Sequence, residues 1–143
     1  MGIFALGLTP TVSTTREKYT YAGDVNSSAT AASAANFAGS ATGNSTVGIF
    51  ALGWTTLRVT TRDKYTYAGD VNSSATASSV AANSGAQTGN STVGIFDLGY
   101  NGSYISTRNK YTYSGDVNSA ATAETIASFG GAACSNGIIG VNA

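Results

Sequence analysis

Two kinds of segment alternate along the chain and set its pattern of apolar and polar positions. One is a short apolar run closed by glycine, such as residues 47–53 (VGIFALG). The other is rich in threonine, tyrosine and charged residues, such as residues 61–67 (TRDKYTY). β-Branched and aromatic residues favour strands, in which successive side chains point to opposite faces. The pattern therefore predicts an all-β protein.

The same motifs return with a period of 46 residues. The apolar motif begins at Gly2, Gly48 and Gly94, and the KYTY and GDVNS motifs keep this spacing. A period of this size indicates a propeller blade or a solenoid turn. We expect one domain of three tandem repeats, at about residues 2–47, 48–93 and 94–139, followed by the start of a fourth.

Each repeat is expected to form four antiparallel strands. In the second repeat they are predicted at residues 45–52, 59–67, 71–75 and within 79–88, with turns at residues 53, 68–70 and 89–90. The fourth segment is rich in alanine and serine, which also allows a helix. Small side chains nevertheless suit the innermost strand of a propeller, where strands crowd around the axis.

The glycine-closed apolar run and the tyrosine-ended run resemble the second and third strands of the kelch repeat. The cassette is also similar to kelch-like repeats of bacteria and phages, in which KYTY and GNSTVGIF recur. The resemblance covers the whole chain and implies four-stranded β-propeller blades. Two features depart from the kelch pattern: the glycine doublet is reduced to Leu-Gly, and serine-rich sequence replaces the usual outer-strand tryptophan. These departures imply an atypical outer edge.

The composition argues against several classes of function. Only 10% of the residues are charged and the net charge is zero, so nucleic acid is not an expected partner. The chain has no histidine, which excludes Ser/His/Asp and Cys/His catalytic groups. We expect neither paired carboxylates nor a nucleophile beside a base. The chain is therefore predicted not to be an enzyme and to need no cofactor.

Cysteine content and apolar segments bear on location. The single cysteine, Cys134, is expected to be a buried structural thiol. Neither a signal peptide nor the roughly 18 consecutive apolar residues of a membrane span is visible. The composition is compatible with an extracellular or phage-associated protein, and the membrane is not an expected partner.

Three equivalent aspartates follow a glycine in the GDVNS motif. They are Asp24, Asp70 and Asp116. An aspartate in a turn can accept hydrogen bonds from the backbone two residues on, so we interpret these residues as structural. The alternative is calcium binding, but one carboxylate per repeat falls short of the 6–8 oxygen ligands that calcium prefers. No metal site is predicted.

Basic residues and tyrosines share the tyrosine-ended segment of each repeat. The basic pair shares one strand face and is predicted to be solvated, with a repeated ring that binds an anionic polymer as the alternative. The tyrosines are expected to pack between blades. The basic residues are Arg16, Lys18, Arg62, Lys64, Arg108 and Lys110, and the tyrosines are Tyr19, Tyr21 and their equivalents.

The loop after the apolar run differs most between repeats. It contains Trp54 and Arg58 in the second repeat, and Tyr100 and Tyr104 in the third. Loops on rigid scaffolds commonly carry recognition. The rings could stack on a sugar or anchor a protein, with Arg58 as polar partner, although loops also vary without any function.

The phase of the repeats favours self-association. The sequence opens on the second strand of a repeat, and residues 136–143 align with the start of that same strand. Three repeats are too few for a propeller, which usually has 4–8 blades. We expect a structural, self-assembling protein that forms a six-bladed ring as a homodimer, with an open head-to-tail filament as the rival. The alternative function is a lectin-like or protein-binding module that uses the variable loops.

Overall fold

All regular structure in the described part of the chain is β-strand, in agreement with the sequence pattern. The computed structural model describes residues 1–5, 7–138 and 140–142. Within these ranges, no helix is long and apolar enough to cross a membrane. The strands are β1 (Gly2–Ala5), β2 (Arg16–Thr20), β3 (Val25–Ala29), β4 (Ser40–Gly43), β5 (Val47–Ala51), β6 (Arg62–Thr66), β7 (Val71–Ala75), β8 (Gln87–Gly89), β9 (Val93–Asp97), β10 (Arg108–Thr112), β11 (Val117–Ala121), β12 (Ala133–Ser135) and β13 (Gly140–Asn142).

The strands form four antiparallel sheets, which follow the chain order. In chain order, the first sheet is β1-β2-β3, the second is β4-β5-β6-β7, the third is β8-β9-β10-β11, and the fourth is the β12-β13 hairpin; the second and third are complete, with four strands each. The register repeats as well as the order. Ile49 pairs with Lys64, and Ile95 pairs with Lys110, at the same place in the two complete sheets. The β12–β13 hairpin continues this register, with Cys134 opposite Val141.

Three of the four predicted strands are correct at their centres, whereas several of their ends and most of the fourth strand are wrong. The third predicted strand coincides with β7, but residues 59–61 precede β6 without being part of it. The alanine- and serine-rich segment is a strand only at its end, because residues 79–86 cross from one sheet to the next instead. Gly89 belongs to β8, and the turn follows at Asn90, whose side chain accepts from the backbone N–H of Thr92 at 2.8 Å and of Val93 at 3.0 Å.

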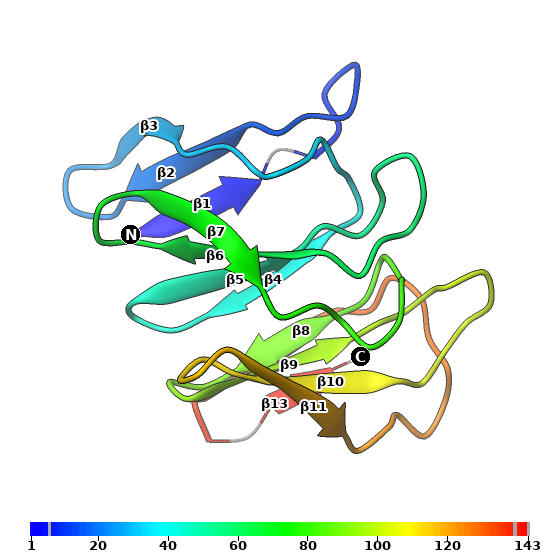
Figure 1. Cartoon of the computed structure of the whole chain (residues 1–143). Helices are drawn as coiled ribbons and strands as arrows, with labels where there is room; N and C mark the ends of the chain where they lie inside the picture. The colour runs from blue at the N-terminus through cyan, green and yellow to red at the C-terminus, as the bar shows by residue number, and fades with distance from the viewer. Residues whose placement is uncertain (6, 139, 143) are drawn as a thin grey trace.

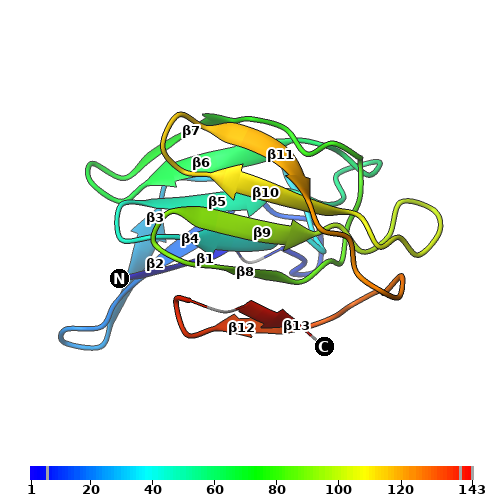
Figure 2. The ribbon, with the colours of Figure 1, turned by 90° about the horizontal axis from the view of Figure 1, so that it is seen from below.

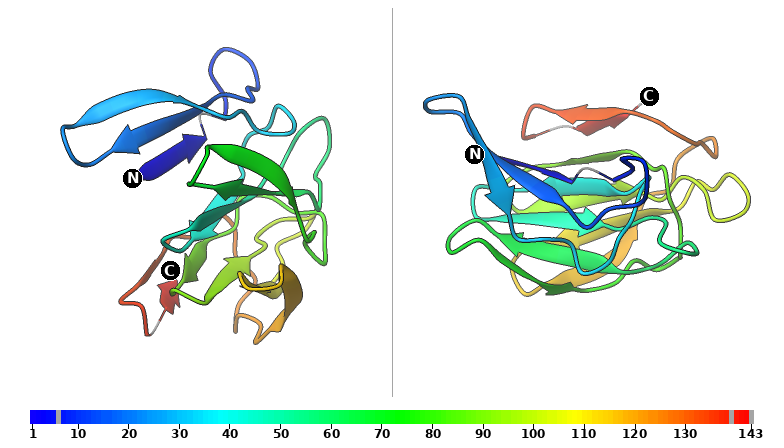
Figure 3. Two further views of the ribbon diagram at one scale, coloured as in Figure 1. Left: turned by 60° about the vertical axis from the view of Figure 1, so that its left-hand side comes forward. Right: turned by 90° about the horizontal axis from the view of Figure 1, so that it is seen from above.

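Successive sheets stack face to face in chain order (Figures 1 and 3). The small-residue strands β4, β8 and β12 lie close together on one side of the stack (Figure 2). The Thr42 hydroxyl donates to the Thr88 carbonyl at 3.2 Å, and the Thr88 hydroxyl donates to the Cys134 carbonyl at 2.9 Å. The same side chain thus links each of these strands to the next.

The apolar core lies between sheets. Ile49 of the second sheet packs with Phe96, Leu98 and Tyr111 of the third, and all four are buried. The equivalent ring on the first sheet, Phe4, is 56% exposed. The face that carries this ring is therefore covered by the preceding sheet in each of the two complete sheets.

Glycine in the second strand allows this close stacking. A Cβ atom on Gly94 would overlap Cγ2 of Thr42 on the preceding sheet, and a Cβ on Gly140 would lie 2.6 Å from Cγ2 of Thr88. Contacts this short require either the threonine side chain or the glycine strand to shift. The glycine at this position of the repeat is thus needed for contact between sheets.

We predict that Gly94→Ala lowers the free energy of unfolding by about 1–3 kcal/mol, the usual cost of overpacking. Thr42→Ala removes the atom that the new methyl group would meet. The double variant should therefore lose less stability than the sum of the two single variants. Urea unfolding of the four proteins measures this coupling, and strictly additive losses would show that the two residues do not meet.

Candidate functional site

A buried arginine forms the polar centre of the contact between the first and second sheets. Arg16 is 1% exposed, and its guanidinium lies 4.4 Å from the centroid of the Phe50 ring. It donates to Asp63 Oδ2 at 2.9 Å and to Asn72 Oδ1 at 2.9 Å. Ser33 completes the contact by donating its backbone N–H and its hydroxyl to Asp63, at 2.9 and 2.6 Å.

The second and third sheets repeat this contact. Arg62 is also 1% exposed, lies 4.2 Å from the Phe96 ring, and donates to Asn118 at 2.9 Å and to Asn109 at 3.4 Å. Burial lowers the pKa of Arg62 to about 10. Nε of each buried arginine has no hydrogen-bond partner among the described residues. The ring beneath the guanidinium therefore supplies part of the stabilisation that water would give an exposed charge.

The prediction of a solvated basic face is wrong for Arg16 and Arg62. The next sheet covers this strand face, so both arginines point into an interface. The lysines lie nearer its rim and bridge the same two sheets: Lys18 Nζ lies 3.7 Å from Asp70 Oδ2, and Lys64 Nζ lies 3.9 Å from Asp116 Oδ2.

Two of the three turn aspartates join neighbouring repeats. Asp24, Asp70 and Asp116 occupy turns with positive φ, but their hydrogen-bond partners differ from those predicted. Each accepts from the hydroxyl of a tyrosine in its own repeat. Asp70 also accepts from the backbone N–H of Thr30 in the preceding repeat at 2.9 Å, and Asp116 accepts likewise from Thr76. In Asp70 and Asp116, the predicted bond from the backbone N–H two residues on is thus replaced by a bond from the backbone N–H of a threonine in the preceding repeat.

The tyrosines differ in burial according to the sheet that carries them. Tyr65 and Tyr111 are fully buried, and the Tyr113 hydroxyl lies 3.0 Å from the hydroxyl of Thr42 on the preceding sheet. Tyr21, the equivalent of Tyr113 in the first repeat, is 68% exposed. Within the described residues, no sheet packs on that face of β1-β2-β3.

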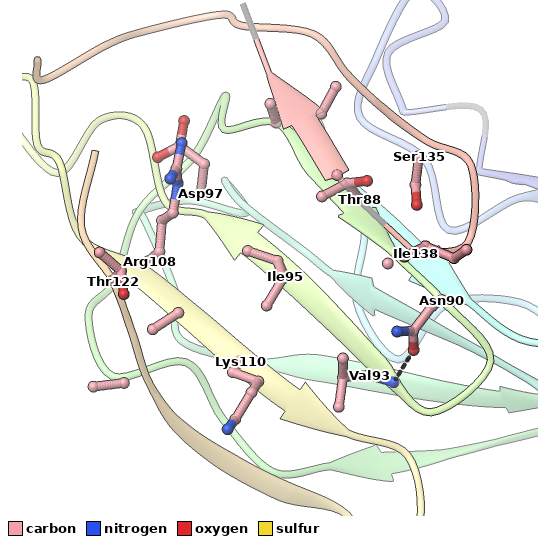
Figure 4. A pocket seen from close by; sticks show the side chains of 16 residues that line it. Thr88, Asn90, Val93, Ile95, Asp97, Arg108, Lys110, Thr122, Ser135 and Ile138 are labelled. Atoms are coloured by element: carbon pink, nitrogen blue, oxygen red, sulfur yellow. Dashed lines mark hydrogen bonds between the residues drawn. The ribbon is translucent and has the colours of Figure 1, made fainter. Parts of the chain in front are cut away.

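A cavity of about 500 Å³ lies over the opposite end of the stack, beside the third sheet and the β12–β13 hairpin (Figure 4). It is lined by Ile95, Arg108 and Lys110 of the sheet, by Thr122, and by Ile138 of the hairpin. In the first two sheets the positions of Arg108 and Lys110 make the contacts described above. The cavity therefore marks a contact face that the hairpin covers only in part.

A second, smaller groove of about 280 Å³ follows β1. It is lined by Ile3, Phe4, Ala5 and Arg16 of the first sheet, by residues 36–41, which lead into β4 and form its start, and by residues 50–52 at the end of β5. In the complete sheets, a small-residue strand pairs with the equivalent of β1 and contacts the next such strand. The groove occupies the corresponding place in the first sheet.

Two carboxylates meet beside the larger cavity, contrary to the prediction that no such pair exists. The Ser128 hydroxyl lies 3.2 Å from Asp97 Oδ2 and 2.6 Å from Glu124 Oε2. Burial, and then the charge of Glu124, raise the pKa of Asp97. Glu124 also pairs with Arg108 at 2.7 Å. The pair is thus held by a serine and an arginine of the same repeat.

The four loop residues predicted to bind a ligand lie together. The Arg58 guanidinium lies 4.9 Å from the Trp54 ring centroid and 4.5 Å from that of Tyr100. Tyr104 stacks next to Tyr100, with a centroid distance of 5.8 Å. The arginine is therefore sandwiched between aromatic rings of two repeats.

The loop stack, as we call this group of loop residues, has three further members that were not predicted from the sequence. Phe37 contacts Trp54, Phe129 contacts both Tyr100 and Tyr104, and Asn83 accepts from Arg58 Nε at 3.2 Å. All three lie 17 to 29 residues from the residues they contact. They belong to the segments that cross from one sheet to the next, where a strand of small residues was predicted instead. A signal was present, because Phe37 and Phe129 interrupt an otherwise small-residue sequence at equivalent positions of the first and third repeats.

The prediction of a buried thiol is wrong, because Cys134 is exposed. Its strand, β12, pairs with β13 and lies beside β8. The sheet that contains it has only these two strands in the described part of the chain, so its outer surface faces solvent.

A scan against models of known protein families and a search of curated proteins find no match for this chain.

We predict that Asp70→Asn lowers stability at neutral pH by about 1 kcal/mol, the net worth of a typical hydrogen bond. The bonds from the Thr30 backbone N–H and the Tyr65 hydroxyl hold the pKa of Asp70 below its ordinary value of 3.8. A carboxylate with a lowered pKa stabilises the fold above about pH 4, and this contribution is lost as the pH falls through the folded-state pKa. Wild type and variant should therefore converge in stability at acid pH.

Asp24→Asn is the matched control, because Asp24 occupies the same turn but is exposed and bonds to Tyr19 of its own repeat. It should change stability less than Asp70→Asn. The melting temperatures of wild type and of the two variants are measured across pH 2–8, with and without calcium. A melting temperature that calcium raises in wild type but not in Asp70→Asn would replace the structural role with metal binding.

Proposed function

We propose that this chain is a self-assembling scaffold protein, built of kelch-like, propeller-type repeats and completed by a second copy. The contact between consecutive sheets carries the proposal, because the chain makes it twice with the same residue positions. The residue positions needed for a third such contact are also present. One half of them lies on the outer face of the third sheet and the other half on the outer face of the first sheet. In the assembly, the face beside β10 and β11 of one copy packs on the face of β1-β2-β3 of the other.

The outer face of the third sheet offers the donors of the contact. Lys110 is equivalent to Lys18 and Lys64, and Thr122 is equivalent to Thr30 and Thr76. Both are exposed, and both line the 500 Å³ cavity. Arg108 occupies the place of the buried arginines in the repeat, and it pairs with Glu124.

The outer face of the first sheet offers the acceptors. Asp24 is equivalent to Asp70 and Asp116, and Phe4 to the two rings beneath the buried arginines. Glu17 is equivalent to Asp63, which accepts from Arg16, and it already accepts from Asn26 as Asp63 accepts from Asn72. Basic and apolar positions on one copy thus meet acidic and aromatic positions on the other.

Head-to-tail contact of this kind either closes or propagates. If the rotation closes, two copies that contribute three sheets each make a ring of six, within the 4–8 blades usual for propellers. If it does not close, the same contact builds a filament. Close packing of β4, β8 and β12 on one side of the stack favours the ring, because it wedges successive sheets around one axis.

The loop stack supports a second candidate function, the binding of carbohydrate. Tyr104 and Phe129 are 64% and 55% exposed, and their rings lie 6.0 Å apart. An exposed tyrosine offers an apolar ring and a hydroxyl that can bond to a ligand. Arg58, which has Trp54 on its other side, holds the ring of Tyr100, against which the exposed pair packs. A sugar ring could stack on this pair.

For the scaffold function, we predict that wild type forms particles of two-chain mass at micromolar concentration. Phe4→Lys places a cation opposite Arg108 of the second copy and should weaken association at least about tenfold, which corresponds to about 1.4 kcal/mol. Light scattering over a concentration series measures this mass. Leu8→Lys is the control, since Leu8 is an exposed apolar residue in the loop after β1, and it should associate as wild type does.

A mixing experiment tests the direction of the contact. Phe4→Lys damages one face and Lys110→Glu the other, so each variant should be largely monomeric alone. A mixture retains one intact pair of faces and should yield two-chain particles. A wild-type monomer at micromolar concentration would refute the scaffold function, and masses beyond two chains would show a filament in place of the ring.

For the binding function, we predict that a glycan array retains wild type and that Tyr104→Ala and Phe129→Ala each reduce this retention. Leu57→Ala is the control, because Leu57 is exposed in a neighbouring loop without a ring contact in the described stack. Equal retention of all four proteins, or none, would remove carbohydrate binding by this stack.

A further inference from the structure

We infer that assembly proceeds by strand exchange, in which β12 of one copy leaves its own β13 and pairs with β1 of the second copy. This inference rests on the proposed self-association and specifies how the two copies join. The exchanged sheet has the order β12-β1-β2-β3, with four strands like the two complete sheets of the chain. The β13 strand then acts as a removable cap on β12.

The register of the complete sheets fixes the pairing. In the second sheet, Thr42 pairs with Ile49, and Ala41 with Phe50. In the hairpin, Cys134 stands at the position of Thr42, where it pairs with Val141. Ile3 and Phe4 of β1 stand at the positions of Ile49 and Phe50. In the exchanged sheet, Cys134 therefore lies opposite Ile3 of the second copy.

Gly2 supplies independent support. Gly94 and Gly140 occupy the same position of the repeat, and each has a threonine of the preceding sheet where its Cβ would lie. No preceding sheet approaches Gly2 within the described residues; the nearest atom to its Cβ position is the Tyr21 hydroxyl, at 3.0 Å. A strand that replaces β13 next to Thr88 needs glycine there, and β1 has it.

Tyr21 and the groove along β1 agree with this arrangement. Tyr113 places its hydroxyl 3.0 Å from that of Thr42, and exchange brings the exposed Tyr21 of the second copy to Thr88 in the same way. The 280 Å³ groove beside β1 lies where β12 of the other copy would enter, between Ile3 and the segment that leads into β4. A strand of small residues fits a space of this kind.

Exchange also improves the burial of apolar groups. The hairpin pairs three residues on each strand, and Val141 of β13 is 59% exposed. Pairing with β1 replaces these backbone bonds and brings Phe4 and Tyr21 under the third sheet of the other copy. An open strand edge is a template for such pairing, and exchange of identical elements is an inexpensive route to dimers.

The first test introduces a cysteine at the predicted partner position. Cα atoms of directly opposite residues lie about 4.5–5.5 Å apart, which a disulfide can span. Ile3→Cys is oxidised at micromolar concentration, and the cross-linked peptides are identified by mass. We expect a bond between Cys134 of one chain and the introduced cysteine of another. Ile3→Cys with Cys134→Ser is the control and should not form it.

The second test cross-links β13 to β12 so that β12 cannot leave the hairpin. Val141→Cys places a thiol opposite Cys134 within the hairpin, so that oxidation in dilute solution joins β12 to β13. The oxidised protein should remain monomeric at concentrations where wild type assembles, and a reductant should restore assembly. Val141→Ser under the same oxidation is the control and should assemble as wild type does.

The outcomes separate strand exchange from self-association itself. Two-chain particles with the predicted cross-link, abolished by the lock, support exchange. Two-chain particles that lack the cross-link and still form from the locked protein overturn exchange while leaving the proposed scaffold function intact. A wild-type protein that remains monomeric at micromolar concentration overturns both.

Discussion

The structure depends on burying a charged arginine between two β-sheets. Arg16 and Arg62 are nearly inaccessible to water, and a guanidinium is costly to bury unless its donors and its faces are satisfied. The next sheet meets this need with an aromatic ring, an amide and either a carboxylate or a second amide. Because these partners come from the following repeat, Arg16 and Arg62 each require the next sheet. The equivalent Arg108 pairs instead with Glu124 of its own repeat.

This requirement explains how a chain with so few charges uses them. Six of the seven basic residues are the Arg and Lys pairs on β2, β6 and β10, and the seventh, Arg58, joins two repeats in the loop stack. Buried polar contacts of this kind fix one register between sheets more strictly than apolar packing alone, since a slip leaves charge without a partner. The same selectivity favours a second copy as the occupant of the outer faces.

Much of the fold follows from sequence, because period and strand pattern are local properties. The all-β architecture and the position of β7 were predicted from alternation and spacing. The burial of Arg16 was not, since alternation shows only that Arg16 and Lys18 share a face and cannot show that another sheet covers it. The partner of Asp70 was missed for the same reason: it lies 40 residues away in the preceding repeat. The loop aromatics were identified because they differ between repeats, whereas Asn83 and Phe129 join them only through the path of the crossing segments.

A crystal structure of the assembled protein would test most directly whether a second copy repeats the contact between sheets. The decisive observation is what surrounds the Phe4 ring. Within the chain, the guanidinium carbon lies 4.4 Å from the Phe50 centroid and 4.2 Å from that of Phe96. We predict that Arg108 of one copy lies over Phe4 of the other at a similar distance, with Lys110 beside Asp24. An assembly in which Phe4 remains in solvent, or packs against a different surface, would contradict it.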